Sequence, residues 1–179
     1  MRIVGGIYKG RVLEPFEKIG VRPTSDMTRE SLFNIIQFKV RGARFLDLFC
    51  GTGAMGIEAL SRGASHVVFN DASRESIKLA NKNLLKLKIT DRIEVFNRDA
   101  ICYLQTTSDE FDIVFIDPPY DSDLGLKSLG VVSRVLKADG VAIYESEKPF
   151  DSEIEGLKIV DRRRYGRANL TFFKKGDNE

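Results

Sequence analysis

Short apolar runs alternate with amphipathic stretches of helical length along most of this 179-residue chain, and this alternation limits the fold more than any other feature. Runs of this length suit buried strands, and the stretches between them repeat apolar residues at helical spacing. The pattern predicts an α/β fold in which parallel β-α-β units place helices on both faces of one sheet. The expected core strands are residues 44–49, 66–70, 92–97, 111–116 and 140–145.

Two further strand-like runs follow near the C-terminus, "GLKIVDRRRYG" and "RANLTFFKK", and only a tight "YGR" joins them. This spacing predicts an antiparallel hairpin at the edge of the sheet. The whole chain should then form a seven-stranded, mostly parallel, Rossmann-like sheet. The stretch before the fifth strand, "LGLKSLGVVSRVLKADG", is expected to be helical, with Gly140 as the glycine just beyond the C-terminus of the helix.

The first forty residues are expected to extend this core. "RIVGGIYKGRVLEP" is strand-like on both sides of a turn at Lys9 and Gly10, which predicts a small β-hairpin. We expect a basic hairpin and helix at residues 1–40, the core at 41–175 and a disordered tail at 176–179.

The helix of this extension should begin within "RPTSDMTRESLFNIIQF". Three residues could cap its N-terminus: Thr24, Ser25 and Asp26. Four residues should form its apolar face: Leu32, Phe33, Ile35 and Ile36.

Composition places the chain among soluble globular proteins, with 42% hydrophobic and 30% charged residues. The sequence has no apolar run long enough to span a membrane and no secretory signal, so a cytoplasmic location without membrane partners is expected. The two cysteines, Cys50 and Cys102, are too few for a zinc framework; free thiols and no metal site are expected.

The net charge is only +2, but the charges are unevenly distributed. Residues 1–44 hold nine Lys or Arg against four Asp or Glu, and residues 157–175 hold seven against one. Two basic ends around an acidic middle fit a surface for a polyanion, provided that the ends meet in space. Two solvated surfaces without a partner explain the charges equally well.

Gly51, Gly53 and Gly56 follow the first core strand with the spacing G-x-G-x-x-G. Glycines at a strand-to-helix turn let the backbone approach a ligand and direct helix N-terminal amides toward it. The pattern alone fits a dinucleotide, S-adenosylmethionine or a simple tight turn.

Acidic residues at three successive strand ends narrow this choice. Asp47 would repel a pyrophosphate but could serve a cationic methionine moiety, Asp71 could accept hydrogen bonds from ribose hydroxyls, and Asp99 could accept one from an adenine amine beside the Ala100 amide. Each acid also has a structural interpretation: Asp47 as an anchor of the turn, Asp71 as a residue before a helix and Asp99 as a helix cap. Their joint position at the ligand-binding edge of a sheet favours an adenosine-containing cofactor.

The fourth strand ends in Asp117-Pro118-Pro119-Tyr120. The two prolines restrict the loop, so the Asp117 carboxylate and the Pro118 carbonyl form a rigid pair of acceptors for an amino group. Tyr120 offers an aromatic face on which a nucleobase can stack. The alternative is a proline turn in which Asp117 binds local amides and Tyr120 packs in the core.

At these residues the chain resembles class I S-adenosylmethionine-dependent methyltransferases, and more narrowly the RsmD family, which methylates N2 of a guanine in bacterial 16S ribosomal RNA. The segments that carry the resemblance are "MRIVGGIYKGRVL", "RPTSDMTRESLFNII", "LDLFCGTGAMGIEALSRGA", "DPPY" and "DRRRYGRANLTFF". Two positions depart from the family pattern: Asp71 stands where glutamate is common, and Cys50 where a small residue is common.

The resemblance implies that Asp47, Gly51 and Gly53 line the methionine side of the cofactor, Asp71 the ribose, and Asp99 with Ala100 the adenine. Asp117, Pro118, Pro119 and Tyr120 would hold the target guanine. It also implies a role in RNA phosphate contacts for the basic residues of both ends, which are Arg2, Lys9, Arg11, Arg22, Arg162, Arg163, Arg164 and Arg167.

The expected protein is thus a monomeric enzyme acting on ribosomal RNA or on an assembling small subunit. The only histidine, His66, begins a strand away from the site and is not expected to be catalytic. Three alternatives remain open: N6-adenine methylation of DNA or RNA, a nucleic-acid-binding module with a relic cofactor pocket, and, more remotely, a dehydrogenase.

Overall fold

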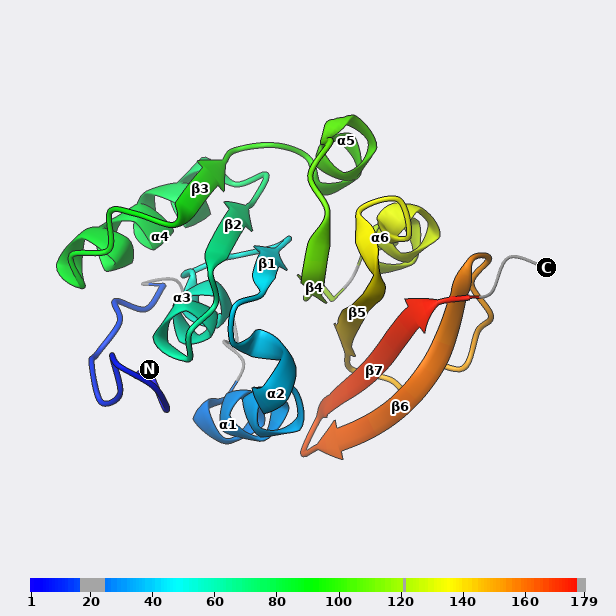
Figure 1. Ribbon diagram of the computed structural model, residues 1–179, viewed down its shortest axis with the longest axis horizontal. Helices are drawn as coiled ribbons and strands as arrows, with labels where there is room; N and C mark the ends of the chain where they lie inside the picture. The colour runs from blue at the N-terminus through cyan, green and yellow to red at the C-terminus, as the bar shows by residue number, and fades with distance from the viewer. Residues whose placement is uncertain (17–24, 121, 177–179) are drawn as a thin grey trace.

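The computed structural model describes residues 1–16, 25–120 and 122–176. In this part of the chain, seven strands form one sheet in the order β3-β2-β1-β4-β5-β7-β6 (Figure 1). The strands are β1 (Arg44–Asp47), β2 (His66–Asn70), β3 (Ile93–Phe96), β4 (Phe111–Ile116), β5 (Leu136–Ser146), β6 (Leu157–Tyr165) and β7 (Ala168–Lys175). The helices are α1 (Asp26–Ile35), α2 (Gln37–Val40), α3 (Ala54–Ser61), α4 (Arg74–Lys86), α5 (Ala100–Thr106) and α6 (Leu124–Val132).

Strands β1 to β5 are parallel, whereas β7 runs antiparallel to both β5 and β6. The predicted C-terminal hairpin and the mostly parallel sheet are therefore confirmed. The strand order reverses between β1 and β4, and open α/β sheets bind ligands at the carboxyl ends of the strands at such a point. The glycine turn follows β1 and the DPPY segment follows β4, so both lie at this point.

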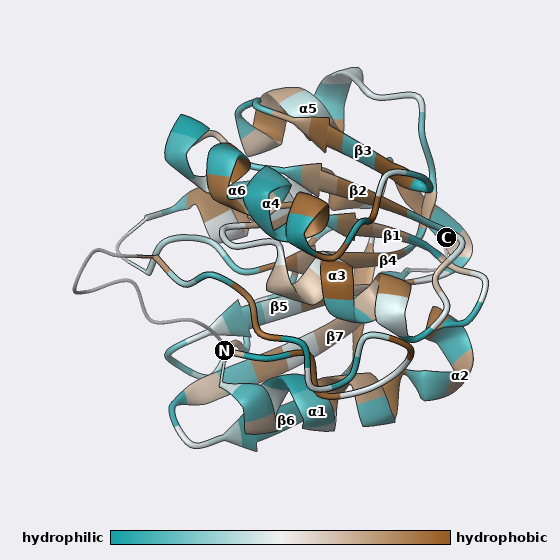
Figure 2. Cartoon of the chain, turned by 90° about the vertical axis from the view of Figure 1, so that its left-hand side faces the viewer, coloured by the Kyte–Doolittle hydropathy of each residue, from teal (hydrophilic) through white to brown (hydrophobic). Residues whose placement is uncertain are grey.

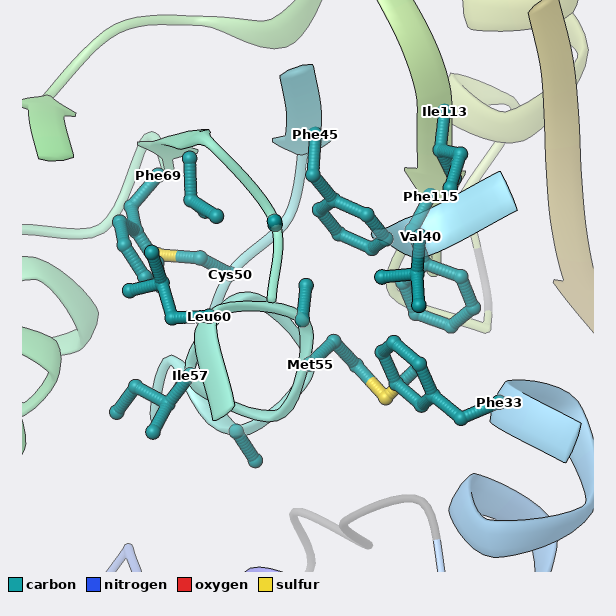
Figure 3. Close-up of a cluster of buried hydrophobic side chains, with 14 of the residues drawn as sticks. Phe33, Val40, Phe45, Cys50, Met55, Ile57, Leu60, Phe69, Ile113 and Phe115 are labelled. Atoms are coloured by element: carbon teal, nitrogen blue, oxygen red, sulfur yellow. The ribbon is translucent and has the colours of Figure 1, made fainter. Parts of the chain in front are cut away.

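Helices cover both faces of the sheet, with α1 to α4 on one side and α5 and α6 on the other (Figure 1). On the first side, Phe45, Phe69 and Phe115 of the sheet are fully buried beneath α3 (Figure 3). Figure 3 also shows Met55 of α3 between the sheet and Phe33 of α1. Helix α3, which begins at the glycine turn, is thus packed in the centre of this core.

The first residues of the chain belong to the same core, since Ile3 and Leu13 are fully buried in it. The expected N-terminal hairpin is reduced to one antiparallel bridge, between Arg2 and Val12. The physical reason is local: the chain turns at Gly6, with φ +74°, to lie against α3. A Cβ on Gly6 would be 1.8 Å from the Ser61 carbonyl oxygen, so no other residue fits there.

Helix α1 begins as predicted, because the Ser25 hydroxyl accepts a hydrogen bond from the Thr28 amide. Leu32, Phe33 and Ile36 are buried, but Ile35 is 38% exposed and was wrongly assigned to the apolar face. Thr24, the other candidate cap before Ser25, lies outside the described residues.

Strand β5 begins at Leu136, four residues earlier than its apolar run suggests, and α6 already ends at Val132. The prediction that the helix continues up to the residue before Gly140 was wrong, because Leu136 already pairs with Phe111 of β4.

A disordered tail was expected at residues 176–179. The Gly176 amide donates to the Gly156 carbonyl, and residues 177–179 lie outside the described residues. Among the helices of the described part, none has the length and apolar character needed to cross a membrane.

Candidate cofactor and catalytic site

The glycine turn has the backbone that its sequence predicts. Gly51 and Gly53 have φ values of +53° and +80°, which favour glycine, and Gly53 is the N-terminal cap residue of α3. A Cβ on Gly51 would meet only the Phe16 ring, at 3.5 Å. A Cβ on Gly56 would lie 2.2 Å from the Phe69 ring. The first two glycines thus supply the backbone conformation of the turn, whereas the third allows α3 to pack closely on β2.

Asp47 lies at the end of β1 and is 1% exposed. Its Oδ2 accepts a hydrogen bond from the Gly56 amide at 2.9 Å. Burial raises the pKa of Asp47 to about 7, the nearby Asp71 charge adds to this, and the Gly56 amide opposes it. In the free protein, Asp47 anchors the first turn of α3, which is the structural role considered for it.

Asp71 follows β2 and is partly buried. Its two carboxylate oxygens accept hydrogen bonds from the Gly51 amide at 2.9 Å and from the Ser73 amide at 2.8 Å. Because each oxygen has a second lone pair, Asp71 can still accept hydroxyl donors while it fixes the glycine turn. The structure therefore joins Asp47, Asp71 and the turn in one hydrogen-bonded unit.

Asp99 follows β3 and caps α5, since its carboxylate accepts a hydrogen bond from the Cys102 amide at 2.9 Å. The Asp99 side chain is exposed, while Ala100 beside it is buried. Both lie at the carboxyl edge of the sheet, as predicted, but on its outer strand β3.

The DPPY segment lies directly beside the glycine turn. The Leu48 amide, three residues before Gly51, donates to the carbonyl of Phe115, which is two residues before Asp117, at 3.1 Å. Strands β1 and β4 therefore stay paired up to the point where the two segments begin. Pro118 is buried, Asp117 is partly exposed and Tyr120 is 46% exposed. Tyr120 is thus partly exposed at the surface and does not pack in the core.

Pro119 has a different role from Pro118. Its carbonyl accepts hydrogen bonds from the Ser122 amide at 3.2 Å and from the Ser122 hydroxyl at 2.7 Å. This closes the turn that leads to α6, so Pro119 stabilises the loop.

Tyr144, which the sequence analysis missed, lies on β5 opposite Ile116, the residue before Asp117. Burial raises the pKa of Tyr144, and the Asp117 carboxylate raises it further. A Cβ on Gly125 would be 2.6 Å from the Tyr144 hydroxyl, so this glycine of α6 makes room for it. The Phe150 ring packs edge-on against Tyr144 at 5.5 Å. The sequence could have indicated this residue, because Tyr144 lies near the carboxyl end of the expected fifth strand, at the edge of the sheet that holds the site.

The C-terminal basic residues lie at the same edge of the sheet. Because β7 is antiparallel to β5 and pairs Asn169 with Ser146, the turn between β6 and β7 lies at the carboxyl end of β5. Arg162 donates to the Phe150 carbonyl at 3.1 Å and pairs with Asp151 at 3.4 Å. These contacts make Arg162 a residue that holds the neighbouring loop.

The other three arginines of this hairpin are exposed. Arg163 pairs with Asp161 at 3.0 Å, and Arg164 Nε donates to the Gly166 carbonyl at 3.2 Å. Arg167 lies in the turn itself, at the carboxyl end of β5.

Three of the N-terminal basic residues lie on one short antiparallel hairpin, in which Arg2 faces Val12 and the Ile3 amide donates to the Arg11 carbonyl at 2.9 Å. Arg2, Lys9 and Arg11 are exposed, but the turn that contains Lys9 hydrogen-bonds to Ser61, at the end of α3 opposite the glycine turn. Arg22 lies outside the described residues. The turn that carries Lys9 is therefore placed away from the glycine turn.

A buried ion pair holds the N-terminal segment in place. Arg29 is fully buried and donates to the Arg2 carbonyl at 2.6 Å and to Asp26 at 2.7 Å. Its Nε lies 3.6 Å from Glu58 of α3, which is also fully buried and accepts from the Val4 amide at 2.9 Å. These charges were not recognised in the sequence, because only the fold brings α1, α3 and the N-terminal segment together.

Three further side chains have the roles that the sequence suggested or left open. Cys50 and Cys102 are free thiols, as expected. His66 begins β2, at the edge opposite the site, and pairs with Glu94 at 2.9 Å.

The comparisons with known proteins agree with this geometry. Residues 1–174 match the family model described as "Conserved hypothetical protein 95". The chain is 34% identical to YlbH of Bacillus subtilis, over 98% of this chain and 99% of that protein. It is 36% identical to "Ribosomal RNA small subunit methyltransferase D" of Escherichia coli, over 89% of this chain and 79% of that protein.

A solved structure shows the same fold. The Escherichia coli protein yhhF superposes with a TM-score of 0.88 and 29% sequence identity, with 99% of each chain covered. Together with the glycine turn beside the DPPY segment, these matches identify the chain as a methyltransferase with an S-adenosylmethionine-type cofactor, and it belongs to the RsmD family.

Proposed function

We propose that this protein transfers a methyl group from S-adenosyl-L-methionine to the exocyclic N2 amine of a guanine in bacterial 16S ribosomal RNA. The observation that carries the proposal is the position of Asp117-Pro118-Pro119-Tyr120, at the end of β4 and next to the glycine turn of β1. The name of the Escherichia coli relative supports small-subunit ribosomal RNA as the substrate class.

The residues at the strand ends fit this cofactor. Gly51 is partly exposed, and the nearby Asp47 and Asp71 would repel a pyrophosphate but suit a cation. We assign the methionine side to the turn with Gly51 and Gly53, the ribose to Asp71, and the adenine to Asp99 and Ala100. When bound, S-adenosylmethionine supplies an electrophilic methyl group on a sulfonium.

The DPPY segment would orient the nucleophile. The Asp117 carboxylate and the Pro118 carbonyl accept hydrogen bonds from the two N–H groups of the amine, which directs its lone pair toward the methyl group. The exposed Tyr120 ring supports the base after it leaves its own stack. As the N–C bond forms and the C–S bond breaks, the nitrogen becomes cationic and then loses a proton to water, so no histidine is needed.

Replacing Asp117 tests this assignment. The variant Asp117→Ala should lower the rate of methyl transfer by about 100-fold or more, because a positioned acceptor of the reacting group is lost. Its affinity for S-adenosylmethionine, measured by calorimetry, should stay close to that of the wild type. The matched control is Asp123→Ala, which removes an exposed carboxylate of the same loop that pairs with Lys127 at 2.7 Å. An Asp117→Ala protein with wild-type activity would overturn the mechanism.

A further inference from the structure

Helix α4 carries a basic residue at every fourth position, and these are Arg74, Lys78, Lys82 and Lys86. All four are exposed, and residues four apart lie on one side of a helix. The helix contains one acidic residue, Glu75. The sequence analysis placed this helix in an acidic middle region, so its basic face was overlooked.

A groove of about 700 Å³ runs between α4 and the N-terminal segment. Lys78, Leu79 and Lys82 line it on one side, and Pro15 and Phe16 line it on the other. In Figure 2 the N-terminal segment crosses in front of α3 and continues toward the hydrophilic ribbon of α4. The groove thus has basic and aromatic walls, a combination that suits a nucleic-acid strand.

The buried side chain of Asn83 holds the groove next to the glycine turn. Its Oδ1 accepts from the Glu14 amide at 2.7 Å, and its Nδ2 donates to the Glu14 carbonyl at 3.2 Å and to the Thr52 carbonyl at 2.9 Å. The Phe16 ring lies 3.5 Å from the position of a Cβ on Gly51. One end of the groove therefore reaches the proposed cofactor site.

Some of the basic side chains of α4 form ion pairs with Glu14 and others do not. Glu14 pairs with Lys86 at 2.5 Å and lies 4.0 Å from Lys82, and both cations lower its pKa. Within residues 1–16, 25–120 and 122–176, no carboxylate forms an ion pair with Arg74 or Lys78. The groove itself is lined by two acids, Glu14 and Glu75, and two lysines, Lys78 and Lys82. Arg74 and Lys86 on the same helix bring the basic groups at this surface to four.

We propose that this groove binds single-stranded RNA next to the target nucleotide, with Arg74 and Lys78 on phosphates and a base against Phe16 and Leu79. The inference rests on the proposed function, because it places the strand at the carboxyl edge of the sheet, where α4 begins and the DPPY segment lies. Phosphate contacts of this kind hold the strand without reading its sequence.

The test compares RNA binding of the variant Arg74→Gln/Lys78→Gln with that of a matched double variant, Lys158→Gln/Lys174→Gln. Lys158 and Lys174 are exposed, pair in register on β6 and β7, and lie at the end of that hairpin away from the site. The probe is transcribed small-subunit ribosomal RNA, titrated at several salt concentrations, and both variants lose the same charge.

Loss of two phosphate contacts should make the dependence of log K on log salt shallower by about 1.4, at roughly 0.7 per contact on a single strand. The control should keep the wild-type slope, and cofactor affinity should be the same in all three proteins. Equal slopes for the α4 variant and the control would overturn the inference but leave the proposed function intact, provided that the wild type methylates the RNA. A wild type that neither binds nor methylates RNA would overturn both.

Phe16→Leu tests the aromatic wall separately, because leucine keeps an apolar contact with the glycine turn but offers no stacking face. RNA affinity should fall by about fivefold or more, the lower end of what one stacked base contributes. Unchanged RNA affinity would contradict the proposal that a base stacks on Phe16 in this groove.

Discussion

Replacing Asp47 by asparagine should remove a pH-dependent loss of stability. Asp47 is fully buried, and its pKa is raised from 3.8 to about 7. Asparagine retains an oxygen that can accept the Gly56 hydrogen bond, but it does not ionise. The variant therefore separates the charge of this side chain from its role as an anchor.

The direction of the pH effect on stability follows from the pKa of Asp47 in the unfolded chain, 3.8, and in the folded chain, about 7. Below about pH 4, Asp47 is protonated in both the folded and the unfolded chain, so its ionisation costs nothing. As the pH rises to about 7, the unfolded chain loses this proton first, and the free energy of unfolding falls. Above about pH 8 both states are ionised and the full cost is present. Three pKa units correspond to about 4 kcal/mol.

Urea unfolding of wild type and Asp47→Asn at several pH values measures this difference directly. The stability of the variant minus that of the wild type should increase by about 4 kcal/mol between about pH 4 and about pH 8. The same variant should bind a cationic cofactor more weakly at pH 8, because one nearby negative charge is missing. A stability difference that does not change with pH would refute the reasoning about this buried carboxyl.

Three further variants test the packing and the surface. Gly56→Ala should lose about 1 to 3 kcal/mol in urea unfolding, because its Cβ would lie 2.2 Å from an aromatic ring of β2; an equally stable variant would contradict the packing. Glu58→Gln should lose about 1.5 to 3 kcal/mol in the same assay, because it removes the buried carboxylate that pairs with Arg62 at 2.7 Å and with Arg29 at 3.6 Å, while Arg29 keeps Asp26; an exposed control such as Glu30→Gln should not. In filter binding to ribosomal RNA, Arg167→Gln should weaken binding more than Arg162→Gln, since Arg162 is held by its own loop; the opposite order would contradict this assignment.

Much of the fold could be predicted because local patterns and tertiary structure agree in the core. The apolar runs that became β1, β2 and β4 are short, buried on both faces and bounded by turns, so their ends are fixed within a few residues. The glycine turn and the DPPY segment follow directly from these ends. Their proximity required only the rule that ligands bind where the strand order reverses.

The parts that were missed depend on partners far away in the sequence. Leu136 joins β5 because Phe111 is there to pair with it, although its own sequence continues a helical pattern. Gly6 turns the N-terminal segment against α3, so the expected hairpin is short, because the Ser61 carbonyl lies beside this glycine. Similarly, the partners of Arg29 and the groove beside α4 exist only when the N-terminal segment is docked. No local periodicity carries this information.

The product of the reaction tests the central claim most directly. Unmethylated small-subunit ribosomal RNA, naked or in an assembling particle, is incubated with the protein and S-adenosylmethionine and then digested to nucleosides for mass spectrometry. We expect N2-methylguanosine with the wild type and none above background with Asp117→Ala. Methylation of adenine N6, or no methylated nucleoside with either form of the substrate, would contradict the proposed function.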